Sequence, residues 1–218
     1  MNRWDDLYRD QRMWLRWPDE LVVRFTHETL KPRGVHRILD LGCGAGRHTV
    51  YLLKEGFVVS AIDSSSHSLE VLTHWIVEEG LSAGLACGSM TALPYRDASF
   101  DAVLAWNVLF YSTPEDLQRS LDEVYRILRR GGLLFGTLLA AEDWRSQTAK
   151  RLGPTLYKGT QGDHTDMIFQ AYATEAEVRT CFSRFPKLTL GHTAWSFGEL
   201  DRQSAHWVMA AEKNRVAQ

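Results

Sequence analysis

The sequence has few cysteines and lacks long apolar runs, and each shortage excludes a class of protein. Its three cysteines are too scattered for a disulfide framework, and no Cys-x-x-Cys or paired His/Cys spacing indicates a metal site. No stretch approaches the roughly 18 uncharged apolar residues of a membrane-spanning helix. The N-terminus lacks the apolar core of a signal peptide. We therefore expect a cytoplasmic protein with no bound metal and no membrane partner.

A block of charge of one sign is also missing. The chain has 25 basic and 27 acidic side chains, for a formal charge of −2, and neither sign forms a run. No nucleic-acid partner is expected, because no basic stripe is present to bind a phosphate backbone. With 218 residues and 44% hydrophobic content, the chain is long enough for one domain with a complete core.

Short apolar runs alternate with helical periodicity from residue 35 onward, a pattern typical of βαβ units and a mostly parallel sheet. The last two runs can pair as an antiparallel hairpin. We therefore expect an α/β fold with a mostly parallel, seven-stranded sheet and a C-terminal antiparallel hairpin. The predicted strands are residues 35–41, 57–62, 81–87, 101–106, 133–139, 188–195 and 206–211.

Capping signals mark the helices between these strands. The clearest helix begins after Thr113, a possible N-cap before Pro114, and is predicted to end with Arg129 and Arg130 before a glycine pair. Further helices are expected over residues 46–55, between Ser66 and Gly80, and over about residues 174–183.

The single domain divides into four parts. An aromatic, helical segment of residues 1–33 precedes the core of residues 34–140, and residues 172–218 hold a helix and the hairpin. Residues 141–171 contain several glycines and show no steady period. We predict that they form a lid-like insertion over the sheet rather than a part of it.

The first predicted strand runs into a glycine-rich turn, DLGCGAG, at residues 40–46. Between a strand and a helix, glycine lets a ligand approach the backbone where any Cβ would clash. The spacing Gly-x-Gly-x-Gly differs from the Gly-x-Gly-x-x-Gly of dinucleotide enzymes, and no P-loop Gly-Lys-Ser/Thr follows. Alternatively, the glycines form only a tight turn, and Asp40 holds it through hydrogen bonds to its own backbone.

This turn and its preceding acid resemble the first motif of the class I S-adenosylmethionine (SAM)-dependent methyltransferases. Asp63 closes the second predicted strand, where the family places an acid that accepts hydrogen bonds from both ribose hydroxyls. Asp63 could instead cap the following helix. Residues 88–94 and 99–101 resemble the family's adenine loop and the start of its fourth strand. The resemblance covers residues 34–140 closely and the remainder in outline.

The resemblance implies a Rossmann-like, doubly wound fold that binds SAM and releases S-adenosylhomocysteine (SAH). One departure is Ser89, which stands where many members have an aspartate that accepts a hydrogen bond from the adenine amino group. A serine accepts that bond more weakly. The cofactor-binding residues that we expect are Asp40, Gly42, Cys43, Gly44, Gly46, Asp63, Ser64, Ser89, Met90 and Asn107.

Methyl transfer from a sulfonium requires alignment more than a covalent nucleophile, and the sequence identifies no catalytic residue. Tyr8 and Trp14 are candidates for the wall of the acceptor site, although the aromatic N-terminal segment could serve only to pack on the sheet. The other candidates for acceptor contacts are Tyr111, His164, Asp166 and Tyr172.

The sequence after the fourth predicted strand restricts the class of molecule that could accept the methyl group. Residues 107–110 read NVLF instead of the Asn/Asp-Pro-Pro-aromatic motif typical of enzymes that methylate nucleic-acid amines. A small-molecule acceptor is therefore favoured, with a protein side chain second. The CGAGRH run and the N-terminal aromatics also resemble the branch that methylates sulfur and other chalcogens. The alternatives are a non-enzymatic SAM-binding regulatory module and a nicotinamide-dependent oxidoreductase, which the glycine spacing disfavours.

Overall fold

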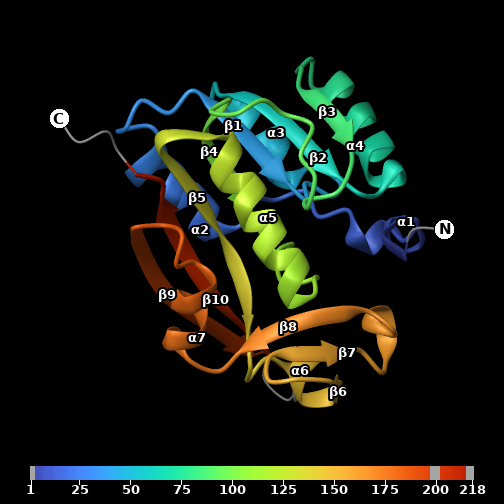
Figure 1. Ribbon diagram of the computed structural model, residues 1–218. Coiled ribbons are helices and arrows are strands. Elements are labelled where there is room, and N and C mark those ends of the chain that lie inside the picture. The colour runs from blue at the N-terminus through green and yellow to red at the C-terminus, as the bar shows by residue number, and fades with distance from the viewer. Residues whose placement is uncertain (1–2, 197–201, 215–218) are drawn as a thin grey trace.

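A ten-stranded sheet forms the centre of the computed structural model, which describes residues 3–196 and 202–214 (Figure 1). The strand order is β3-β2-β1-β4-β5-β8-β7-β6, with β10 paired to β5 and β9 paired to β10. The strands are β1 (Arg37–Leu41), β2 (Val58–Asp63), β3 (Gly84–Cys87), β4 (Phe100–Ala105), β5 (Leu128–Ala140), β6 (Lys150–Arg151), β7 (Leu156–Lys158), β8 (Ile168–Tyr172), β9 (Lys187–Ser196) and β10 (Gln203–Glu212).

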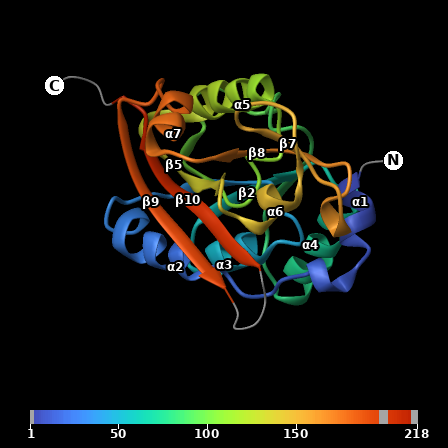
Figure 2. The same ribbon diagram turned by 90° about the horizontal axis from the view of Figure 1, so that it is seen from below.

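Strands β1 to β5 run parallel to one another, and helices cover both faces of the sheet. Figure 2 shows α5 on one face and α2, α3 and α4 on the other. Two separate apolar clusters correspond to these faces, one around Leu117 and Leu121 of α5 and one around Val22 and Leu52. The α-helices are α1 (Arg3–Tyr8), α2 (Glu20–Phe25), α3 (Arg47–Lys54), α4 (Ser66–Glu78), α5 (Pro114–Ile127), α6 (Trp144–Thr148) and α7 (Glu175–Cys181).

All seven predicted strands are present, and the mostly parallel α/β fold and the C-terminal hairpin of β9 and β10 are confirmed. The predicted insertion is wrong in one respect, because part of residues 141–171 joins the sheet. Strand β8 runs parallel to β5, with Leu139 opposite Ala171, and β7 pairs antiparallel with β8. Strands β6, β7 and β8 therefore account for the ten strands observed in place of the seven predicted.

The start of α5 is as predicted, but its end is not. Thr113 accepts a hydrogen bond from the amide of Asp116, and Pro114 occupies the first turn. The helix ends at Ile127, and Arg129 belongs to β5, where it forms an ion pair of 2.9 Å with Asp101. Because Leu128 already pairs with β4, the glycine pair lies within a strand at a register shift rather than at a helix end.

The N-terminal segment is helical, as expected, and α1 is attached to the loop between β2 and α4. Asp5 accepts hydrogen bonds from the Ser65 hydroxyl at 2.7 Å and from the His67 amide at 3.2 Å. Helix α1 therefore lies beside the carboxyl end of β2, where parallel α/β sheets bind their ligands.

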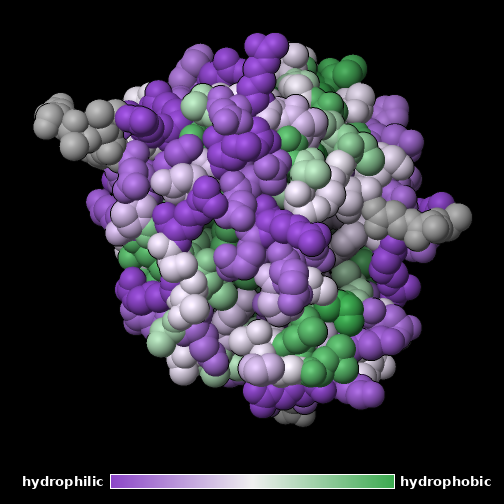
Figure 3. Space-filling view, viewed as in Figure 1, coloured by the Kyte–Doolittle hydropathy of each residue, from purple (hydrophilic) through white to green (hydrophobic). Residues whose placement is uncertain are grey.

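The face of the protein in Figure 3 is mostly hydrophilic, with apolar side chains gathered near β6 and β7. Within residues 3–196 and 202–214, no helix has both the length and the apolar character that a membrane crossing requires.

Candidate functional site

The glycine-rich turn connects β1 to α3 in a conformation that disfavours other residues. Gly42, Gly44 and Gly46 have φ angles of 69°, 53° and 96°, in the left-handed region. A Cβ at Gly44 would lie 2.1 Å from the hydroxyl oxygen of Tyr8, and one at Gly42 would lie 2.3 Å from Val108. The turn therefore needs glycine both for its backbone angles and for its close neighbours.

Asp63, at the end of β2, both supports this turn and faces a cavity. One carboxylate oxygen accepts from the Gly44 amide at 2.8 Å, and the other accepts from the Ser65 amide at 2.9 Å. Burial raises the pKa of Asp63, whereas these hydrogen bonds lower it. Each oxygen keeps a further lone pair for a ligand. The capping alternative is wrong, because Ser65 is the N-cap of α4 and accepts from the Ser68 amide, whereas Asp63 faces the cavity.

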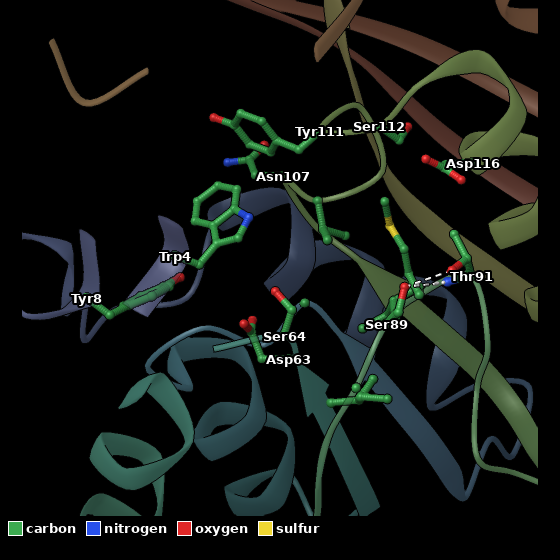
Figure 4. A pocket seen from close by; sticks show the side chains of 16 residues that line it. Trp4, Tyr8, Asp63, Ser64, Ser89, Thr91, Asn107, Tyr111, Ser112 and Asp116 are labelled. Atoms are coloured by element: carbon green, nitrogen blue, oxygen red, sulfur yellow. Dashed lines mark hydrogen bonds between the residues drawn. The ribbon is translucent and has the colours of Figure 1, made fainter. Parts of the chain in front are cut away.

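A cavity of about 290 Å3, the Asp63 cavity, opens at the carboxyl ends of β1, β2 and β4. Figure 4 shows Asp63 and Ser64 pointing into it, with Trp4 and Tyr8 of α1 on one side. Of the predicted cofactor residues, this cavity is lined by Gly42, Asp63, Ser64, Ser89, Met90 and Asn107.

A neighbouring cavity, the loop cavity, lies over the glycine-rich turn. The predicted cofactor residues that line it are Gly42, Cys43, Gly46 and Asn107, and the predicted acceptor residues are Tyr8, Tyr111 and His164. The hydroxyl of Tyr111 lies 3.4 Å from Nδ1 of His164. Burial lowers the pKa of His164 to about 4, so its imidazole is neutral at pH 7. The structure thus brings three of the six candidate acceptor residues together.

Several predicted residues lie elsewhere. Asp40 is buried below the turn and lines none of the cavities described here; its carboxylate accepts a hydrogen bond of 2.6 Å from Thr49 of α3. Trp14 donates its ring N–H to the Tyr8 carbonyl at 2.7 Å, and therefore supports α1 from outside the cavities. Asp166 pairs with Lys158 at the surface, and Tyr172 is buried in the core.

Other lining residues were not predicted from the sequence. Trp4 lines both the Asp63 cavity and the loop cavity, and Asp116 and Thr91 line the first of them. Trp4 could have been chosen from the N-terminal aromatic cluster, one turn before Tyr8. Asp116 carries no such signal, because it is also an ordinary acidic residue in the first turn of a helix.

Asn107 follows β4 and lies where the cavities meet. Its φ of 58° is unusual for a residue with a side chain. Its backbone N–H donates to the Thr137 hydroxyl at 2.9 Å, and that hydroxyl donates to the side-chain oxygen Oδ1 of Asn107 at 2.9 Å. Because the hydroxyl proton is committed to Oδ1, the Nδ2 group of Asn107 is left as a donor toward the cavities.

A third and larger cavity, the outer cavity, has a volume of about 790 Å3. It shares six lining residues with the loop cavity, and we call this shared region the neck. The neck consists of Leu15, Arg47, Trp106, Asn107, Arg145 and His164.

Comparison with known proteins gives this arrangement a family. Residues 38–132 match the family described as a methyltransferase domain. The chain is 35% identical over 128 residues to malonyl-(acyl-carrier protein) O-methyltransferase of Enterobacter lignolyticus, an alignment covering 58% of this chain and 46% of that protein. This similarity groups residues 38–132 with the class I SAM-dependent methyltransferases. The chain spans about half the length of the curated relatives that it matches.

Solved structures share the fold of this protein. A SAM-dependent methyltransferase of Methanosarcina mazei has a TM-score of 0.69 at 20% identity, covering 82% of this chain and 92% of that one. The 1,6-didemethyltoxoflavin-N1-methyltransferase of Burkholderia thailandensis, solved with its substrate and SAH, has a TM-score of 0.65 at 22% identity, covering 97% and 87%. At these identities the likeness concerns the fold alone.

The residues around these cavities fit SAM, the methyl donor of the matched family. The Asp63 carboxylate offers two acceptor oxygens to a vicinal diol, and Ile62, Met90 and Val108 give the same cavity apolar walls for a flat ring. The adjoining turn exposes backbone rather than side chains at Gly42 and Gly46.

Proposed function

We propose that this protein transfers a methyl group from SAM to a small-molecule acceptor. The observation that carries the proposal is the position of Asp63, whose carboxylate faces a cavity beside a turn with three glycines in the left-handed region. Asp63 would hold the ribose, Ser89 and Met90 would contact the adenine, and the turn at residues 42–46 would hold the amino acid part. When bound, SAM supplies an electrophilic methyl group.

The protein's own contribution would be to align two molecules and to exclude water. Trp4 and Tyr8 form the wall of both inner cavities on the side of α1. The acceptor would enter through the outer cavity and meet the methyl group at the neck. The neutral imidazole of His164 lies at the neck, next to the Tyr111 hydroxyl of the loop cavity, and can orient an acceptor through a hydrogen bond.

A small molecule is supported as acceptor by the volume of the outer cavity, about 790 Å3, and by the relatives. A relative from Methylocella silvestris, 37% identical over 103 residues, is a ubiquinone biosynthesis O-methyltransferase. The structural neighbour from Burkholderia thailandensis is solved with 1,6-didemethyltoxoflavin. The outer cavity shares lining residues with the loop cavity, which in turn shares residues with the Asp63 cavity, and this disfavours a regulatory module without access for an acceptor.

A thermal shift assay with SAH tests the cofactor. At 100 times its Kd, a ligand stabilises the folded state by about 2.7 kcal/mol, which corresponds to about 5–10 °C for a chain of this length. NADH should give no shift. Incubation with labelled SAM and a metabolite extract, followed by mass spectrometry, should then identify the methylated small molecule. Absence of any shift with SAH would contradict the proposal.

A further inference from the structure

The neck between the loop cavity and the outer cavity is rich in hydrogen-bond donors. Arg47, Asn107 and Arg145 all line both cavities. The Nδ2 group of Asn107 faces this region, because Thr137 occupies its oxygen. Two arginines and an amide nitrogen thus meet at the place where an acceptor would approach the inner cavities.

Arg47 is a half-buried cation at the neck. No hydrogen bond or ion pair of its side chain is found within residues 3–196 and 202–214. Asp19 and Asp40 attract it only from a longer distance, and partial burial lowers the pKa of its guanidinium. A partly desolvated charge without a close counterion gains from an anionic ligand.

Arg145 is held in place with one amino group left toward the neck. Its Nε and Nη2 donate to the two carboxylate oxygens of Asp143 at 2.8 and 2.9 Å. Its Nη1 has only the Tyr111 hydroxyl, at 3.5 Å, which is too long for a strong bond. Asp143 therefore fixes the guanidinium plane, and Nη1 remains available for a ligand.

The acidic side chains around the outer cavity already have partners. Asp19 caps α2 by accepting from the Leu21 amide at 3.0 Å, and Glu20 forms an ion pair of 2.9 Å with Arg24. Burial lowers the pKa of His206 to about 4, so it is neutral at pH 7. No acidic group among the described lining residues therefore forms a close pair with the neck arginines.

Tryptophans stand among the mostly polar lining residues of the outer cavity. Trp106 and Trp144 line it, and the guanidinium of Arg202 lies over the Trp144 ring, 4.7 Å from its centroid. Indole rings bind flat ligands well, because aromatic pairs gain from offset or edge-to-face contacts. These indoles and the donors of the neck together suit a ligand that has a flat ring and an anionic group at the inner end of the cavity.

We propose that the acceptor is an aromatic carboxylic acid, with its carboxylate bound at the neck by Arg47, Asn107 and Arg145. This inference rests on the proposed function. A carboxylate suits these donors because its two oxygens together can accept from all three groups, and an ester or amide of the same acid loses the charge.

The test uses the whole protein saturated with SAH and titrated calorimetrically with cinnamate and indole-3-acetate, each paired with its methyl ester. We expect both acids to bind at least tenfold more tightly than their esters. Arg47→Gln should weaken the acids at least tenfold and leave the esters and SAH unchanged. Arg179→Gln, on the exposed side of α7 and paired with Glu175, is the matched control and should change nothing.

The competing occupant of these donors is the carboxylate of SAM itself. If Arg47→Gln weakens SAH but not 5′-methylthioadenosine, which lacks that carboxylate, the proposal is overturned. Equal binding of acid and ester to the parent protein, or no binding of either acid, also overturns it. If the parent protein fails to bind SAH, the proposed function falls together with this inference; if SAH binds and the acids show no preference, only this inference falls.

Discussion

At the scale of single residues, Asp63 links the fold to the site, because the same carboxylate that holds the Gly44 amide also faces the Asp63 cavity. Asp63→Asn should weaken SAH binding about 10- to 100-fold, or about 1–3 kcal/mol. An amide has one acceptor oxygen, so its nitrogen would face one of the N–H groups of Gly44 and Ser65. Isothermal titration calorimetry measures the loss.

A matched control for this change is Asp122→Asn. Asp122 lies on the exposed side of α5 and pairs with Arg184. Its loss should leave SAH affinity within twofold of the parent, since exposed ion pairs contribute little. Equal affinities for the Asp63 variant and the parent would mean that the carboxylate does not bind the ribose.

Gly44 and Tyr8 should behave as a coupled pair. Gly44→Ala places a Cβ 2.1 Å from the Tyr8 hydroxyl oxygen, so it should displace α1 and reduce SAH affinity at least 100-fold. Tyr8→Phe in the same chain removes the nearest atom and should recover at least tenfold of this loss. Calorimetry on the two single variants and the double variant gives the coupling directly.

Gly56→Ala is a control that introduces backbone strain without a contact such as that between Gly44 and Tyr8. Gly56 has a φ of 89°, and a Cβ there would meet nothing within 4 Å. This variant should be less stable but should bind SAH like the parent. Additive effects of Gly44→Ala and Tyr8→Phe would contradict the close contact.

The residues predicted correctly for the site are those whose position follows from their own strand. Asp63, Ser64 and Ser89 follow parallel strands, and the carboxyl ends of such strands meet at one edge of the sheet. Trp4 and Arg145 come from α1 and α6, and local sequence does not fix where these short helices pack. Asp40 matches the family motif, yet its carboxylate accepts a hydrogen bond from the Thr49 hydroxyl below the turn instead of facing a cavity.

At the scale of elements, α1 forms one wall of the inner cavities, and the side chain of Asp5 attaches this helix to the start of α4. The Asp5 carboxylate bonds to Ser65 and to the His67 amide in the first turn of α4, and the Ser65 bond lowers the pKa of Asp5. Asp5→Ala should loosen α1 and raise the dissociation rate of SAH about tenfold, with the sheet intact. Stopped-flow displacement of SAH measures this rate.

The neighbouring Asp6 provides the control for the attachment of α1. Asp6 pairs with Arg9 on the exposed side of the same helix. Asp6→Ala should leave the dissociation rate of SAH unchanged. If both variants released SAH at the parent rate, α1 would not act as a wall of the site.

Element prediction failed where strands were too short to show a pattern. Strands β6 and β7 have two and three residues, and a period of two cannot be recognised over such lengths. They belong to the sheet only because β8 pairs with β5 beside them. The predicted end of α5 was also wrong. Arg129 belongs to β5 and pairs with Asp101, and a contact with a residue so far away in sequence does not show in the local pattern.

At the scale of the whole molecule, the folded state carries the cost of burying the Asp40 carboxylate. Burial raises its pKa to about 6, compared with about 3.9 in an unfolded chain. Between pH 4 and 6 the folded state therefore binds more protons than the unfolded state. The contribution of Asp40 to the free energy of unfolding consequently decreases as the pH rises through this window, by about 3 kcal/mol in total.

Asp40→Asn isolates this contribution, because asparagine can still accept the hydrogen bond from Thr49 but does not ionise. Urea unfolding of parent and variant at pH 4 and pH 7 cancels the titration of all other groups. From pH 4 to pH 7, the free energy of unfolding of the parent should fall by about 2–3 kcal/mol relative to that of the variant. A difference that stayed constant with pH would show that Asp40 titrates as in water. The variant should bind SAH like the parent, since Asp40 lines none of the three cavities.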